Sequence, residues 1–261
     1  MIKTLLDTDL GTFSDDILAL LFLLKHPEIE LKGITIVGED KEIGADFTKQ
    51  MLKSAGKQAP VYTGAKVPKE SADNKAADFL VNEITSHKGE YNLVAIGQLT
   101  NVASALTKEP NLLAYLNSTY IMGGALYRSY ELDSYTPEYN FAKDPKAAEK
   151  VVCAKGSKIL VPLDVTMNAV VKEAELKKLK ELGELERKSL ELIDRCYLTE
   201  EMHDSLAVIA MTNPEITTIE KRQISIREDG VVLTEGTETD VCLDFDYDKF
   251  KKIFDGIIYK N

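Results

Sequence analysis

The chain has 261 residues, 44% of them hydrophobic, which is enough to form the core of one large domain or two small ones. Its net charge of −11 argues against a nucleic acid or an anionic membrane as partner, since both require a basic face. The longest apolar run, residues 17–24, is too short to span a bilayer, and no signal peptide is apparent. The scattered cysteines Cys153, Cys196 and Cys242 form no Cys-x-x-Cys pair, which fits a reducing compartment. We therefore expect a soluble, cytoplasmic protein.

Short apolar runs alternate with segments of helical periodicity along the chain. Strands are predicted over residues 2–6, 31–37, 61–62, 92–96, 118–122 and 159–163. Helices are predicted over residues 14–25, 43–55, 76–87, 102–109, 144–154, 173–198 (with breaks near Gly183), 201–212 and 247–258. Residues 224–245 alternate in polarity like antiparallel strands, and residues 125–140 form a long irregular segment. This order predicts an α/β fold in a single domain, residues 1–261, with a mostly parallel central sheet flanked by helices, Rossmann-like in kind, and a small antiparallel C-terminal element.

Many polar side chains come directly after a predicted strand. In open α/β sheets ligands bind beyond the carboxyl ends of the strands, so the geometry predicts that these side chains meet at one rim. They are Asp7, Asp9, Asp15, Asp16, Glu39, Asp40, Thr100, Asn101, Glu138, Asn140 and Asp164.

The first strand is followed by four carboxylates, Asp7, Asp9, Asp15 and Asp16, with Gly11 between the two pairs. Anions this close repel one another, and the arrangement is costly unless a cation lies among them. Carboxylates on a loop suit a hard ion such as Ca²⁺ or Mg²⁺ rather than zinc. Asp15 or Asp16 taken alone is better explained as a helix cap, because Asp is common at helix starts. The set as a whole predicts a metal site.

Two further features place polar groups in the same region. Glu138 and Asn140 point the same way if the chain is extended there, and they could then hold sugar hydroxyls, although a capped loop explains the pair alone more simply. His203 and Asp204 open a helix that continues as an apolar run. At that position an acid can face a cation and a histidine can titrate near neutrality, but a surface or core histidine is an equally good interpretation.

Taken together and in this order, the motifs resemble the inosine-uridine-preferring nucleoside hydrolases. That family opens with a strand and an Asp-x-Asp-x-Gly…Asp-Asp-x-x-Ala-Leu loop, here Asp7-Thr8-Asp9-Leu10-Gly11 and Asp15-Asp16-Ile17-Leu18-Ala19-Leu20. Further matches span nearly the whole chain: Gly97-Gln98-Leu99-Thr100-Asn101, Met122-Gly123-Gly124, Glu138-Tyr139-Asn140-Phe141, Leu163-Asp164-Val165-Thr166 and His203-Asp204. The resemblance implies Ca²⁺-dependent hydrolysis of the N-glycosidic bond of a ribonucleoside or related N-riboside, in purine or pyrimidine salvage. It also implies a homo-oligomer, a dimer or a tetramer.

The resemblance also implies roles for individual residues. The Ca²⁺ ligands are expected to be Asp9, Asp16, the backbone carbonyl of Thr100, and Asp204. Asp9 is also expected to be the general base, and His203 the proton donor for the leaving base. The expected substrate contacts are Asp15, Glu39, Met122, Glu138 and Asn140. Asp7 is expected to support the metal set.

The chain departs from the family at the sugar and base contacts. The opening loop is two residues longer than the commonest form and carries Phe13, Glu39 replaces an asparagine, and residues 127–135 replace a Gly-Asn pair. We infer a hydrolase-type site whose substrate can differ from ordinary nucleosides. Two alternatives stay open: a haloacid-dehalogenase-like phosphatase, which also opens with Asp-x-Asp after a strand, and a metal- or ligand-binding homologue that has lost catalysis.

Overall fold

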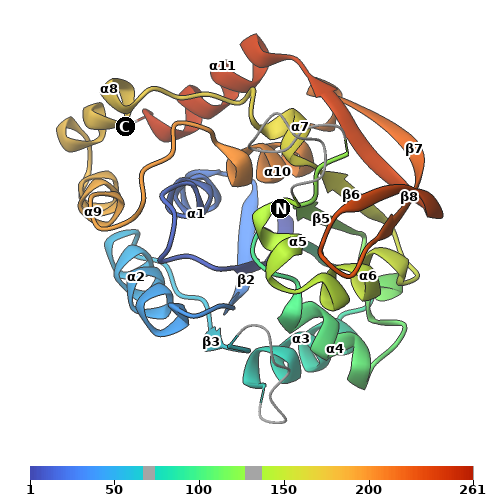
Figure 1. The fold of residues 1–261 in the computed structure, drawn as a ribbon. Coiled ribbons are helices and arrows are strands. Elements are labelled where there is room, and N and C mark those ends of the chain that lie inside the picture. Colours follow the sequence, from blue (N-terminus) through green and yellow to red (C-terminus); the bar gives the residue numbers. More distant parts are fainter. Residues whose placement is uncertain (67–73, 127–136, 261) are drawn as a thin grey trace.

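The centre of the protein is an eight-stranded sheet in the order β3-β2-β1-β4-β5-β6-β8-β7 (Figure 1). The structure is a computed structural model that describes residues 1–66, 74–126 and 137–260. Neighbouring strands are parallel except for β7 and β8, which are antiparallel. The strands are β1 (Ile2–Thr8), β2 (Ile29–Ile36), β3 (Val61–Thr63), β4 (Asn92–Ala95), β5 (Ser118–Met122), β6 (Lys158–Val161), β7 (Thr217–Ile226) and β8 (Val232–Phe245).

Helices cover both faces of the sheet, and the predicted α/β fold is confirmed. The helices are α1 (Asp15–Lys25), α2 (Lys41–Ser54), α3 (Lys75–Ser86), α4 (Thr100–Lys108), α5 (Tyr139–Lys143), α6 (Pro145–Cys153), α7 (Leu163–Thr166), α8 (Glu173–Leu176), α9 (Glu184–Ile193), α10 (His203–Thr212) and α11 (Tyr247–Ile258). The antiparallel pair continues the central sheet, because β8 lies parallel to β6.

The two faces of the sheet bury separate hydrophobic clusters. Successive side chains of a strand point to opposite faces, and accordingly Leu5 of β1 belongs to one cluster and Leu6 to the other. Helices α1, α2, α9, α10 and α11 contribute to the cluster of Leu6, and α3, α4 and α6 to the cluster of Leu5 (Figure 1). Full burial of one such side chain contributes about 1.5–3 kcal/mol.

Helices α1 and α10 fix the position of the rim most strongly. Residues 15–24 of α1 and residues 204–211 of α10 are all buried, so both helices are enclosed on every side. The two helices contact each other, and each has an acidic residue in its first turn. Since a helix N-terminus carries a partial positive charge, it stabilises carboxylates such as Asp16 and Asp204.

One local prediction is wrong, because the strand expected over residues 159–163 ends at Val161 and Leu163–Thr166 form helix α7. For Glu138 and Asn140 the structure agrees with the simpler interpretation as a capped segment. Glu138 is the N-cap of α5 and accepts hydrogen bonds from Asn140 N and Phe141 N. Of the irregular segment expected over residues 125–140, residues 127–136 lie outside the described ranges. In the described part of the chain, no helix combines the length and the apolar character needed to cross a membrane.

Candidate active site

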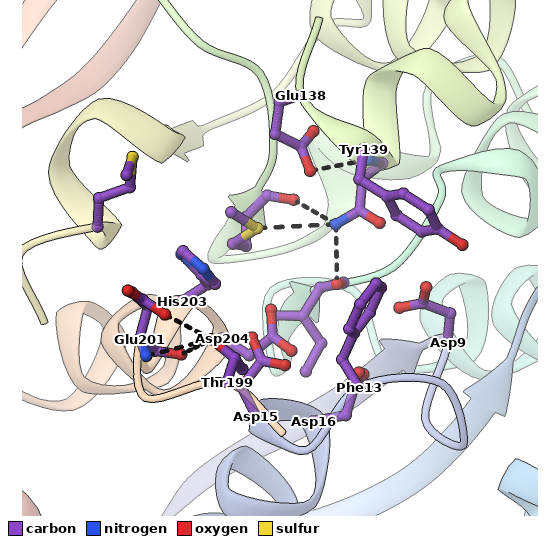
Figure 2. A pocket seen from close by; sticks show the side chains of 14 residues that line it. Asp9, Phe13, Asp15, Asp16, Glu138, Tyr139, Thr199, Glu201, His203 and Asp204 are labelled. Carbon is purple, nitrogen blue, oxygen red and sulfur yellow. Dashed lines mark hydrogen bonds between the residues drawn. The ribbon is translucent and has the colours of Figure 1, made fainter. Parts of the chain in front are cut away.

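Most of the predicted site residues line one cavity of about 320 Å³ (Figure 2). They are Asp9, Asp15, Asp16, Met122, Glu138, Asn140, His203 and Asp204. The other lining residues are Phe13, Ile96, Tyr139, Met167, Thr199 and Glu201. The loop after β1, the end of β5 and the first residues of α5 and α10 thus meet at one place, as expected for the carboxyl edge of the sheet.

Three carboxylates form a compact group at this cavity. Asp15, Asp16 and Asp204 each offer an oxygen that lies within 4.8 Å of the others, and all three side chains are buried. Burial is the main cause that raises the pKa of Asp16 and of Asp204 well above the usual range, and the neighbouring carboxylates raise both further. Burial also raises the pKa of Asp15, although His203 opposes that shift. The group therefore holds negative charge at a high electrostatic cost.

The chemistry of these donors fits a hard divalent cation. All of them are oxygens, which suits Ca²⁺ or Mg²⁺ and disfavours ions that prefer sulfur or imidazole. Neutral donors support the group, since the Thr8 hydroxyl donates to Asp16 Oδ1 and backbone hydrogen bonds lower the pKa of Asp15 and of Asp16. The pKa values of these carboxyls nevertheless stay raised, so the neutral donors do not offset the buried charge, whereas a divalent cation does.

Asp9 lies beside this group but does not belong to it. Burial raises its pKa to about 7, and a hydrogen bond from Gln98 Nε2 to Asp9 Oδ2 opposes that shift. The charge of Asp9 contributes to the raised pKa of both Asp16 and Asp204, so Asp9 interacts electrostatically with both carboxylates. In the view of Figure 2, the Phe13 ring lies between Asp9 and Asp15.

Phe13 connects the long opening loop to a distant segment. Its ring packs edge-on against Tyr139 at 5.2 Å between centroids and lies 6.2 Å from the ring of Tyr197. Ser14 N donates to Tyr197 O at 3.1 Å, and Tyr197 N donates to Thr12 O at 3.0 Å. The loop is therefore tied to the segment before α10, and the aromatic ring forms part of the cavity wall.

Glu138 and Asn140 present acceptors to the cavity. Glu138 accepts from Gly124 N at 2.9 Å as well as from its own helix, so it is held in place by three backbone donors. The Asn140 amide nitrogen donates to Ile96 O at 3.1 Å, which leaves its carbonyl oxygen for another partner. The Glu138 carboxylate and the carbonyl oxygen of Asn140 are acceptors, and they match a ligand that carries hydroxyl donors.

His203 is held by the Leu163–Thr166 segment that the sequence singled out. Its Nδ1 lies 2.8 Å from the Thr166 hydroxyl, so Nε2 is the nitrogen left for a ligand in the cavity. Burial lowers the pKa of His203, and the charge of Asp15 opposes that shift. An imidazole fixed through one nitrogen is suited to accept or give a proton at the other.

Asp7 and Thr100 lie behind the cavity. Asp7 is fully buried and its Oδ1 accepts from Thr35 and Asn101, while its Oδ2 has no partner among the described residues. Burial raises the pKa of Asp7 to about 7. Thr100 is the first residue of α4, and its hydroxyl donates to Asp144 at 2.7 Å. Neither side chain is among those that line the cavity.

Glu39 lies on the far side of Asp9. Its side chain is 60% exposed and pairs with Lys66 at 3.0 Å. It lines a neighbouring cavity of about 490 Å³, to which Asp9, Gln98 and Tyr139 also contribute. Asp9 therefore borders two cavities, and Glu39 belongs to the second one only.

Sequence reasoning missed several residues of the site, among them Thr199, Glu201, Gln98 and Thr166. Thr199 and Glu201 are hydrogen bonded to each other at 2.7 Å (Figure 2), and they reach the cavity through the pairing of residues 197–199 with the opening loop and of Glu201 with Val170. No local pattern signals either pairing. Gln98 and Thr166 stood inside recognisable motifs, but their contacts with Asp9 and His203 depend on the fold.

Comparisons with known proteins agree with the geometry. A model of the inosine-uridine preferring nucleoside hydrolase family matches residues 4–252. The probable uridine nucleosidase 1 of Oryza sativa subsp. japonica is 23% identical, covering 88% of this chain and 82% of its own. The pyrimidine-specific ribonucleoside hydrolase RihB of Escherichia coli is 26% identical, covering 64% of this chain and 61% of its own.

Solved structures of similar fold include a purine-preferring ribonucleoside hydrolase from Gardnerella vaginalis. It is 22% identical, has a TM-score of 0.84, and is covered over 98% of each chain. The family match favours the nucleoside hydrolases over the haloacid-dehalogenase-like alternative. Because the match extends over nearly the whole chain, the prediction of a nucleoside hydrolase enzyme is confirmed, and the chain belongs to the inosine-uridine preferring nucleoside hydrolase family.

Proposed function

We propose that this enzyme catalyses the Ca²⁺-dependent hydrolysis of the N-glycosidic bond of a ribonucleoside or related N-riboside, releasing base and ribose. The observation that carries the proposal is one cavity that holds both a group of buried carboxylates and the acceptors of Glu138 and Asn140. In Figure 2, Glu138 lies on the opposite side of the cavity from Asp15 and Asp204. The names of the three relatives state different bases, so the feature they share is the ribonucleoside.

The proposed Ca²⁺ ligands are Asp9, Asp16, Asp204 and the backbone carbonyl of Thr100. All are oxygen donors. Asp9 raises the pKa of Asp16, and both raise the pKa of Asp204, which supports a shared cation. When bound, the ion supplies positive charge that lowers the pKa of water and orients vicinal hydroxyls. Asp7, fixed by Asn101 and Thr35, supports the end of β1 from which Asp9 follows.

In the proposed reaction, Asp9 takes a proton from water while the water oxygen bonds to C1′ of the ribose. The C1′–N bond breaks, and its electron pair leaves with the base. The transition state has oxocarbenium character, which nearby anions such as Asp15 and Glu138 stabilise. His203, held at Nδ1 by Thr166 and protonated beside the charge of Asp15, gives a proton from Nε2 to the departing base and is left as neutral imidazole.

The proposed sugar contacts are Asp15, Glu138, Asn140 and Met122. Three of them present acceptors, and Met122 contributes an apolar surface. Glu39 would reach a substrate only from the second cavity, which it shares with Asp9. We further propose a cytoplasmic homo-oligomer that acts in nucleoside salvage and binds no nucleic acid, in line with its net charge of −11.

One alternative is a homologue that binds metal and ligand without turnover. The observation that favours it is the Phe13 ring, which lines the cavity close to the carboxylates that the reaction needs. A bulky ring there can exclude an ordinary nucleoside, and a fold does not by itself guarantee an activity.

The test is ribose release from a panel of ribonucleosides and from p-nitrophenyl riboside, with p-nitrophenyl phosphate as the comparison compound. The proposal predicts ribose from at least one riboside, loss of activity with a strong chelator, and recovery on adding Ca²⁺. Calcium binding without turnover of any riboside would favour the alternative. Cleavage of p-nitrophenyl phosphate without cleavage of any riboside would favour the haloacid-dehalogenase-like phosphatase.

A further inference from the structure

The carboxylate of Asp9 is held by the loop that follows β4. A Cβ placed on Gly97 would lie 2.9 Å from Asp9 Oδ1 and 2.6 Å from Asp9 N, so only glycine leaves room for the side chain as it stands. The next residue, Gln98, donates its amide Nε2 to Asp9 Oδ2. Two consecutive residues of one loop therefore determine where both oxygens of Asp9 lie.

Gln98 is itself confined. Its side chain is 3% exposed, and its Oε1 has no hydrogen-bond partner in the described part of the chain. Gly38, with φ of +99°, lies against that oxygen, and a Cβ there would approach it to 2.9 Å. The reverse orientation of the amide would set two acceptors against each other, so the carboxylate requires the nitrogen to face Asp9.

This arrangement costs stability. A buried amide carbonyl without a partner is destabilising, and an apolar side chain of similar size would avoid that cost. The favourable contact that the Gln98 side chain makes here is the one to Asp9. The side chain is therefore suited to orienting Asp9, and it stabilises the fold less than leucine or methionine would.

Gln98 also lies outside the cavity in which the substrate is proposed to bind. It lines the neighbouring cavity, whereas Asp9 borders both. Figure 2 shows Asp9 at one edge of the main cavity, across from His203. Gln98 thus reaches the carboxylate from behind and does not touch the space between Asp9 and His203.

We propose that Gln98 is a positioning residue for the reaction: its amide holds Oδ2 of Asp9, so that the other oxygen is the one that accepts the proton of the attacking water. The proposal rests on the proposed function, since it requires Asp9 to act as the base. It predicts that Gln98 affects the attack of water on every substrate, independently of the leaving group.

The test compares Gln98→Leu and Gln98→Met, which remove the donor and keep the size, with the wild-type enzyme. We expect kcat to fall by about 10–100-fold, part of the 10²–10⁴ that a general base contributes, while KM changes by less than about twofold. The fall is expected to be equal for a purine riboside and p-nitrophenyl riboside. Circular dichroism and melting temperature establish that the variants are folded.

The matched control is Gln50→Leu. Gln50 Nε2 donates to Asp46 at 2.7 Å on the surface of α2, so the control removes the same kind of hydrogen bond away from the site. It is expected to leave kcat and KM unchanged.

An unchanged kcat in a folded Gln98 variant refutes the positioning role. As long as the wild-type enzyme releases ribose, that result does not affect the proposed function. A raised KM with unchanged kcat would make Gln98 a substrate contact, and failure of both variants to fold would make it a packing residue; either result refutes the proposal. A wild-type enzyme that releases ribose from no riboside refutes the proposed function and the positioning role together.

Discussion

Replacing Asp204 with asparagine should change stability in opposite directions with and without calcium. Asp204→Asn removes one negative charge from three buried carboxylates whose oxygens lie within 4.8 Å of one another. Two unit charges at that separation repel by about 3.5 kcal/mol at an effective dielectric constant of about 20. Part of this repulsion is already relieved by protonation, since the pKa of Asp204 is raised.

For the metal-free protein we therefore expect a gain of about 1–3 kcal/mol in the free energy of unfolding. For a chain of this size this corresponds to a rise of about 2–10 °C in melting temperature. In saturating Ca²⁺ the order should reverse, because the variant loses a ligand and with it most of the stabilisation that binding confers.

The assay is calorimetric or fluorescence melting of both proteins, first in a strong chelator and then in saturating CaCl₂. Asp194→Asn, at an exposed position after α9, is the control and should shift neither curve appreciably. If the metal-free Asp204→Asn protein melts below the wild type, the carboxylate group is not repulsive and our account of the metal site is wrong. If Ca²⁺ raises the melting temperature of the wild type and of the Asp204→Asn protein equally, Asp204 is not a calcium ligand.

Three further substitutions test the assigned roles. Asp9→Ala should lower kcat by about 10²–10⁴ in a protein that stays folded by circular dichroism, because it removes the general base; retained turnover would exclude that role. His203→Ala should slow the release of a poor leaving group such as a purine far more than that of p-nitrophenol, and equal slowing of both would exclude it as the proton donor. Thr166→Val should slow purine release about tenfold more than p-nitrophenol release, because the Thr166 hydroxyl holds Nδ1 of His203. Thr166→Ser keeps the hydroxyl and should restore the wild-type ratio of the two rates. A Thr166→Val enzyme with wild-type behaviour on both substrates would mean that Thr166 only packs.

The fold could be predicted from the sequence because the patterns that indicate its strands and helices are local and repeated. Buried parallel strands such as residues 92–95 are short apolar runs, and Pro or Gly follows closely after helices α1, α2, α4, α5 and α10. Where a local signal misled, a specific residue was responsible. The apolar run of residues 159–163 was expected to be one strand, but Pro162 cannot donate to the sheet and precedes the short helix Leu163–Thr166.

Only part of the candidate site could be predicted from the sequence. The residues in recognisable motifs, such as Asp16 and Asp204, do meet at one cavity. The distances that matter chemically depend on contacts between remote segments, which periodicity does not encode. Tyr197 pairs with the opening loop and brings Thr199 to the cavity, and Gln98 holds Asp9 across 89 positions of the sequence.

The central claim is that an ion bound by Asp9, Asp16, Asp204 and the backbone carbonyl of Thr100 enables this chain to hydrolyse a riboside. The most direct measurement titrates Ca²⁺ into the metal-free protein and follows bound calcium and ribose release in the same samples. Our account predicts that ribose release rises in proportion to the first calcium bound per chain, and that the Asp204→Asn protein shows neither. Full activity in the metal-free protein, or complete calcium binding with no release of ribose, would contradict it.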